Sequence, residues 1–101
     1  MSDIVIYMNS NDFLHKTSDG IYYWSMGRAP KTFTEEDKIF FATNKHVMGF
    51  VDCGEFNPED IGGETLVWDG DTFEYIMSIP CKQFRGFRYR WFDYELEKDR
   101  Q

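Results

Sequence analysis

Short apolar runs, each ended by turn-forming residues, dominate the pattern of this chain. Residues 4–8 (IVIYM) form a continuous apolar run rich in β-branched side chains, which predicts a buried strand. Six further runs of similar length predict strands at 21–26, 38–43, 46–51, 64–68, 72–77 and 84–92. Residues 12–16 are compatible with one helical turn capped by Asn11 or Asp12. The pattern therefore predicts a mainly β chain with little helix.

Two of the predicted turns join neighbouring strands into hairpins. Asn44-Lys45 is a tight polar turn between the runs 38–43 and 46–51. Asp69-Gly70-Asp71 separates the runs 64–68 and 72–77 and is the strongest hairpin signal, because Asp-Gly turns supply the positive φ angles that such connections need. Strands at this spacing are typical of a small antiparallel barrel or sandwich.

The length of 101 residues predicts a single domain, which we place at 1–92, followed by a polar tail at 93–101. A small chain needs a dense core, and the 19% of aromatic residues supply one. The N-terminal residues lack the basic and apolar regions of a signal peptide. No run approaches the roughly 20 apolar residues of a membrane span. We therefore expect a cytoplasmic protein that does not bind membranes.

Motifs for metal binding and catalysis are absent from the sequence. The histidines and cysteines show no chelating spacing, and Cys53 and Cys81 are expected to be reduced core residues. The chain has no GxSxG sequence, and Gly62-Gly63 lacks the Lys and Ser or Thr of a phosphate-binding loop. We expect no cofactor, no metal and no catalytic residue.

Charge is distributed unevenly along the chain, whose net charge is −7. Residues 1–80 carry five basic and fourteen acidic side chains, a balance of −9. Residues 81–92 carry four basic side chains and no acid, a balance of +4. An acidic surface of this kind excludes a general DNA-coating or polybasic membrane-binding protein and leaves one local basic segment.

Within that segment, residues 85–91 (RGFRYRW) alternate arginines with aromatic residues. In a half-buried strand the aromatic side chains would face the core and the arginines the solvent. On one interpretation this is only a solvated strand face, with the arginines paired to acids of the same chain. On the other interpretation, Arg88 and Arg90 bind successive phosphates and Trp91 stacks on a base.

Residues 22–31 (YYWSMGRAPK) form the second notable segment. Aromatic side chains lie on both faces of the predicted strand, and a constrained loop with two cations follows it. Proteins hold single-stranded or flipped bases with such aromatic slots beside cations. A core strand followed by an ordinary loop is the alternative.

The order of these features resembles the PUA-like superfamily, which includes PUA, ASCH, EVE and YTH domains. The resemblance runs from about residue 22 to 51, and more loosely to 92. It is carried by Tyr23-Trp24, the loop 27–31, the unit 36–41 (EDKIFF) and the strand 47–51 (VMGFV). It implies a compact pseudo-barrel with one or two short helices that binds RNA or a modified base. By position, the implied pocket contains Tyr23, Trp24 and Ser25, with Arg28 and Lys31 at its rim.

These observations lead to three hypotheses. The first is a non-catalytic domain that binds RNA, single-stranded DNA or a modified nucleobase in an aromatic pocket with a basic rim. Its predicted ligand-binding residues are Tyr23, Trp24, Ser25, Arg28, Lys31, Arg88, Arg90 and Trp91. The second is an acidic interaction module or small inhibitor with a basic protein partner. The third, implied by some ASCH relatives, is an amidohydrolase using Lys31, Thr32 and Glu74.

Overall fold

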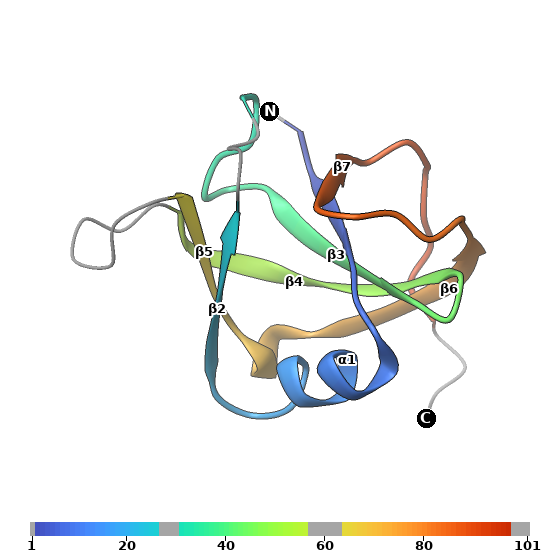
Figure 1. Cartoon of the computed structure of the whole chain (residues 1–101), viewed down its shortest axis with the longest axis horizontal. Helices are drawn as coiled ribbons and strands as arrows, with labels where there is room; N and C mark the ends of the chain where they lie inside the picture. Colours follow the sequence, from blue (N-terminus) through green and yellow to red (C-terminus); the bar gives the residue numbers. More distant parts are fainter. Residues whose placement is uncertain (1, 27–30, 57–63, 98–101) are drawn as a thin grey trace.

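The computed structural model describes residues 2–26, 31–56 and 64–97, which fold into a strongly curled, half-barrel sheet with one α-helix (Figure 1). This confirms the mainly β prediction. The elements are β1 (Ile4–Tyr7), α1 (Ser10–Lys16), β2 (Ile21–Met26), β3 (Lys38–Thr43), β4 (His46–Phe56), β5 (Glu64–Asp69), the 3₁₀ helix η1 (Gly70–Thr72), β6 (Glu74–Pro80) and β7 (Phe87–Tyr89). No helix in these described ranges is long and apolar enough to cross a membrane.

The sheet has the strand order β2-β5-β4-β3-β1-β7, and β6 also pairs with β4. The long strand β4 makes this possible, since its first part pairs with β6 and its last part with β5 while β3 follows its other edge. All strand pairs are antiparallel except β1 with β3, which is parallel. The sheet is therefore mainly antiparallel, with one parallel pair at β1 and β3. The α1 and β2 segments lie between β1 and β3 in sequence and form the crossover that parallel strands require.

Both faces of the central strands are buried, which explains their unbroken apolar runs. Alternate residues of β3 point to opposite faces: Ile39 and Phe41 belong to one core cluster, Phe40 and Ala42 to another. The first cluster includes Trp68, whose ring centroid lies 5.3 Å from that of Phe41. Each cluster fixes the orientation of the strands it covers.

The helix α1 begins at Ser10, two residues before the predicted start at residue 12. Asn9 is the N-cap, and its side-chain oxygen accepts a hydrogen bond of 2.8 Å from the backbone N–H of Asp12. The expected caps, Asn11 and Asp12, lie inside the helix instead. Phe13 on its buried face packs into the first core cluster, so tertiary packing extends the helix beyond a single turn.

One of the two predicted hairpins is confirmed and the other is wrong. Asn44 and Lys45 adopt φ angles of 51° and 62°, and they join β3 to β4 in an antiparallel pair. In contrast, β5 and β6 pair with different parts of β4 and not with each other. The Asp69 side chain accepts a 2.9 Å hydrogen bond from the Asp71 N–H and caps η1, which turns the chain away from a hairpin.

The C-terminal segment covers the outer face of the central strands. The strand predicted at 84–92 is limited to β7, and the residues around it are irregular. Tyr94, inside the predicted tail, packs with its ring centroid 5.0 Å from that of Phe40. Next, the Met77 N–H donates to the Glu95 carbonyl at 2.9 Å, so residues 95–97 run along β6.

Candidate functional site

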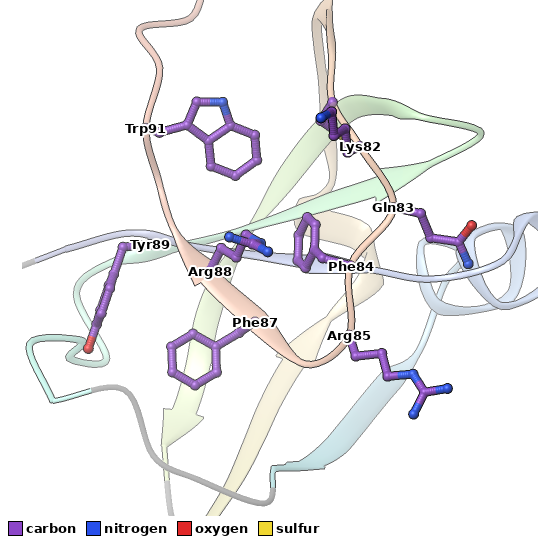
Figure 2. Close-up of a pocket in the computed structure, with 9 residues that line it drawn as sticks. Lys82, Gln83, Phe84, Arg85, Phe87, Arg88, Tyr89 and Trp91 are labelled. Carbon is purple, nitrogen blue, oxygen red and sulfur yellow. The ribbon is translucent and has the colours of Figure 1, made fainter.

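Residues 81–91 form a loop that leaves β6, turns at Gly86 and passes through β7, enclosing an open hollow of about 810 Å³ (Figure 2). This single segment supplies the whole lining of the hollow. The lining residues are Cys81, Lys82, Gln83, Phe84, Arg85, Phe87, Arg88, Tyr89 and Trp91.

The main chain holds both ends of this loop on the sheet. The Cys81 N–H donates to the Lys45 carbonyl at 2.9 Å, and the Arg90 N–H donates to the Asp3 carbonyl at 2.9 Å. Between them, β7 pairs with β1. Gly86 has a φ of 72°, a conformation that glycine adopts without steric cost and that lets the chain reverse just before β7. The hollow is thus supported by a paired strand and two anchored ends.

Three cations and no acid line the hollow. The guanidinium carbon of Arg88 lies 5.1 Å from the centroid of the Phe84 ring, so this cation rests on an aromatic face. Among the described residues, the ion pairs are Lys38–Asp52 and Arg90–Asp3, and neither includes a cation of the hollow. None of the three cations of the lining therefore forms an ion pair with a described acid.

The aromatic side chains of the hollow are only partly covered. The Trp91 ring meets that of Phe84 edge to face, with 6.3 Å between centroids and an interplanar angle of 79°. Trp91 nevertheless keeps 49% of its surface exposed, and Tyr89 keeps 40%. A half-exposed indole held by its neighbours and placed beside cations has the chemistry of a stacking platform.

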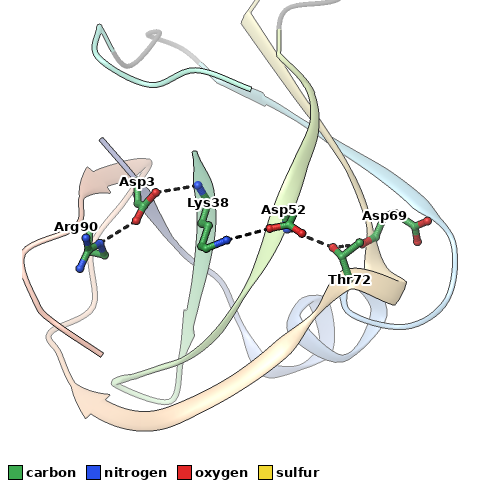
Figure 3. Close-up of polar contacts among 6 residues, drawn as sticks. All are labelled: Asp3, Lys38, Asp52, Asp69, Thr72 and Arg90. Atoms are coloured by element: carbon green, nitrogen blue, oxygen red, sulfur yellow. Dashed lines mark hydrogen bonds and ion pairs between the residues drawn. The ribbon is translucent and has the colours of Figure 1, made fainter. Parts of the chain in front are cut away.

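Arg90, the next cation of the alternating strip, makes contacts within the protein (Figure 3). Its Nε lies 2.9 Å from Asp3 Oδ2, and its guanidinium also donates to the Phe92 carbonyl. Its guanidinium carbon lies 5.5 Å from the Tyr94 ring centroid. Arg90 does not line the hollow. Arg90 therefore fits the interpretation in which the arginines pair with acids of the same chain, whereas Arg88 forms no ion pair with a described acid.

The structure does not bring the early aromatic segment into the same hollow. Tyr23, Trp24 and Ser25 lie on β2, which ends the sheet order on the side opposite to β7. Trp24 packs against the first core cluster, whereas Tyr23 is 63% exposed. The proximity that the sequence hypothesis requires between these residues and the late arginines is therefore not observed.

The remaining predicted site residues, Arg28 and Lys31, follow β2 in the sequence. Arg28 lies outside the described residues. Lys31 is exposed, and its backbone N–H donates to the Tyr89 hydroxyl at 2.7 Å, which places it beside the hollow without lining it. Of the seven predicted residues that the structure describes, Arg88 and Trp91 line the hollow.

Sequence reasoning missed the first half of the lining. Lys82, Gln83 and Phe84 precede the alternating strip and Arg85 is its first residue, yet these four residues form the wall opposite β7 (Figure 2). The signal that identifies them is the uninterrupted +4 balance of residues 81–92, which extends further than the alternation of arginines and aromatic residues. Charge summed along the segment was the better guide to this surface.

The described residues offer little nucleophilic or metal chemistry. Burial raises the pKa of the Cys81 thiol. Burial, with smaller contributions from Glu35 and Asp37, raises the pKa of Cys53 to about 12, so both thiols are protonated at neutral pH. No group of three His, Cys, Asp or Glu side chains within the described ranges is arranged to hold a metal ion.

The residues of the amidohydrolase hypothesis are not joined by any hydrogen bond in the structure. The Lys31 N–H is bonded to Tyr89, and the Thr32 carbonyl accepts from the Ser2 N–H at 3.0 Å. Glu74, in contrast, lies opposite Phe50 in the β4–β6 ladder. A general acid or base needs direct or water-mediated contact with the reacting group, and these residues make no such constellation with one another.

Comparison with protein-family models, curated proteins and solved structures found no match. The resemblance to the PUA-like superfamily therefore stays a prediction.

Proposed function

We propose that the protein binds single-stranded nucleic acid, RNA or DNA, in the hollow formed by residues 81–91. The observation that carries the proposal is that three cations without an ion pair to a described acid and a half-exposed tryptophan line one open hollow. In this arrangement, Lys82, Arg85 and Arg88 contact phosphates. Trp91 stacks on a base, either an ordinary or a modified one.

The rest of the chain supports a local and single-stranded mode of binding. The net charge of −7 disfavours a long duplex lying across the surface, since most of it would face acidic side chains. A flexible single strand can place a few phosphates against the basic segment and leave the remainder in solvent. Stacking on Trp91 requires an unpaired base, which duplex nucleic acid does not present.

Fluorescence anisotropy with labelled oligonucleotides of about eight residues tests the proposal, using RNA, DNA and a strand with a modified base. Binding is expected at low salt. Each neutralised phosphate contributes a slope of about −0.7 to a plot of log affinity against log salt, so three contacts give a slope of about −2. The variant Arg88→Gln should reduce that slope by about 0.7.

Two further variants separate the site from the general charge of the protein. Trp91→Ala should weaken binding by roughly 5-fold to 100-fold, the range expected for one lost base stack, with little effect on the salt slope. Lys16 lies on α1 and does not line the hollow. Lys16→Gln removes one positive charge, as Arg88→Gln does, and should leave the affinity unchanged. Absence of binding by all three oligonucleotides at low salt, or equal losses in Arg88→Gln and Lys16→Gln, would contradict the proposal.

A further inference from the structure

The strand β2 is an end strand of the sheet, and within the described residues it pairs with β5 alone (Figure 1). Its six residues, IYYWSM, include no charged residue and no proline. Natural edge strands are commonly protected by charges, prolines or bulges, because an open edge accepts another strand. The sequence of β2 has no protecting residue of these kinds.

The hydrogen-bonding direction of β2 follows from a contact at its start. The Gly70 N–H donates to the Gly20 carbonyl at 2.8 Å, so the backbone of Gly20 faces β5. Backbone groups alternate between the two edges of an antiparallel strand. The N–H and C=O groups of Ile21, Tyr23 and Ser25 therefore point away from β5, at the open edge.

The side chains of the same residues lie on the outer face of the sheet. Ile21 is 68% exposed and Tyr23 is 63% exposed, and Ser25 is exposed as well. Tyr22 and Trp24, which alternate with them, pack against the first core cluster. An added strand would thus gain main-chain hydrogen bonds along the edge and, from Ile21 and Tyr23, an apolar surface beside it.

One end of this edge is strongly acidic. Asp19 directly precedes β2, Asp69 is the register partner of Ile21, and Asp71 lies just beyond it. A hydrogen bond to Asp19 and the negative charge of Asp19 raise the pKa of Asp71, with smaller contributions from desolvation and Asp69. The three carboxylates therefore repel one another. Neither ion pair among the described residues supplies them with a cation.

We propose that the open edge of β2 binds an extended segment of a partner protein that adds a strand to the sheet and carries Lys or Arg where it meets Asp19, Asp69 and Asp71. An antiparallel strand is favoured, and it places these basic residues at the C-terminal end of the partner segment. A second copy of the chain is disfavoured, because it brings the same net charge of −7 and the same three carboxylates. This surface is distinct from the hollow, which lies along β7 at the other end of the sheet order.

The test uses a fluorescent peptide of alternating Thr and Val residues that ends in three lysines, compared with the same peptide ending in three glutamates. Anisotropy titration should show saturable binding of the lysine peptide, at least about tenfold tighter than the glutamate peptide. N-methylation of the peptide amides that face β2 should weaken binding by about tenfold or more, because each methyl group removes a main-chain hydrogen bond. This readout leaves the protein unchanged.

Variants of the protein provide the complementary test. Tyr23→Pro removes an N–H that points away from β5, so the β2–β5 ladder is retained while the open edge loses a donor. It should abolish peptide binding, and Tyr23→Thr, which keeps the N–H, should preserve binding within a few-fold. The variant Arg88→Gln should bind the peptide as the unaltered protein does, even if it no longer binds oligonucleotides.

Three results would overturn the proposal. The first is equal affinity for the lysine and glutamate peptides, and the second is binding that N-methylation does not weaken. The third is self-association of the chain that Tyr23→Pro abolishes, with no peptide binding, which would assign the edge to a second copy. None of these depends on whether the hollow binds nucleic acid, so the two proposals fail separately.

Discussion

Arg90 Nε lies 2.9 Å from Asp3 Oδ2, and the Arg90 N–H donates to the Asp3 carbonyl at the same distance. The other carboxylate oxygen of Asp3 accepts from the Lys38 N–H at 2.8 Å. One acidic side chain thus joins the start of β1 to the start of β3 and to the chain after β7 (Figure 3). Arg90 thus stabilises the fold, whereas Arg88 forms no ion pair with a described acid.

Loss of this junction should destabilise the protein. In Asp3→Ala, the Lys38 N–H loses its acceptor, and we expect the free energy of unfolding to fall by about 1–3 kcal/mol. The ion pair itself is partly exposed and contributes little of this. Asp3→Asn retains an oxygen acceptor and should lose less. Urea denaturation measures both, and Asp93→Ala, which removes an exposed acid, is the control. An unchanged midpoint for Asp3→Ala would show that the junction does not contribute to stability.

Two glycines should respond differently to the same substitution. A Cβ at Gly49 would collide with the Glu74 carbonyl oxygen and lie 2.6 Å from the Phe73 ring, so β4 and β6 would have to move apart. A Cβ at Gly86 meets no atom within 4 Å, so the cost of a side chain there comes only from the φ of 72°, which L-residues rarely adopt. We expect Gly86→Ala to cost about 1–2 kcal/mol and Gly49→Ala about 3 kcal/mol or more. Thermal and urea unfolding compare the pair, and the reverse order would contradict the packing.

Local sequence patterns predicted the strands well because each strand is marked by its own apolar run. The runs at 38–43 and 46–51 became a hairpin, since Asn44 and Lys45 can adopt positive φ locally. The hairpin predicted at the Asp-Gly turn 69–71 was wrong because the pairing of β5 and β6 is determined by a distant strand and not by the turn. The first part of the long strand β4 pairs with β6 and its last part pairs with β5, and no local signal encodes that division.

The candidate site was only partly predictable for the same reason. The cations and aromatic residues of 81–91 are neighbours in sequence, so their grouping could be recognised from composition. The expected contribution of Tyr23 and Trp24 depended on sheet order, which places β2 and β7 at opposite ends. Whether an arginine is free or paired also depends on distant residues: Asp3 lies 87 positions from Arg90.

The carboxylates at the start of β2 should make the folded state sensitive to Asp71. Its pKa is raised in the fold, chiefly by Asp19, so ionisation of Asp71 costs the folded state more than the unfolded chain. Stability from this group is present at low pH and is lost as the pH rises above the ordinary value of 3.8. We therefore expect Asp71→Asn to raise the melting temperature at pH 7, with a smaller gain in high salt and none near pH 2.5. Asp93→Asn is the control. An equal gain at both pH values would refute the electrostatic origin.

The thiol of Cys53 should make stability fall in alkaline solution. Its pKa is about 12 in the fold and ordinarily 9.0, so between these values the unfolded chain releases a proton that the folded protein keeps. The unfolded state then binds fewer protons, and the free energy of unfolding decreases by up to about 1.4 kcal/mol per pH unit. Urea unfolding from pH 8 to 10.5 measures this decrease. Cys53→Val should show a shallower slope, because it removes the thiol and its contribution to the pH dependence. Parallel slopes would mean that the thiol ionises equally in both states.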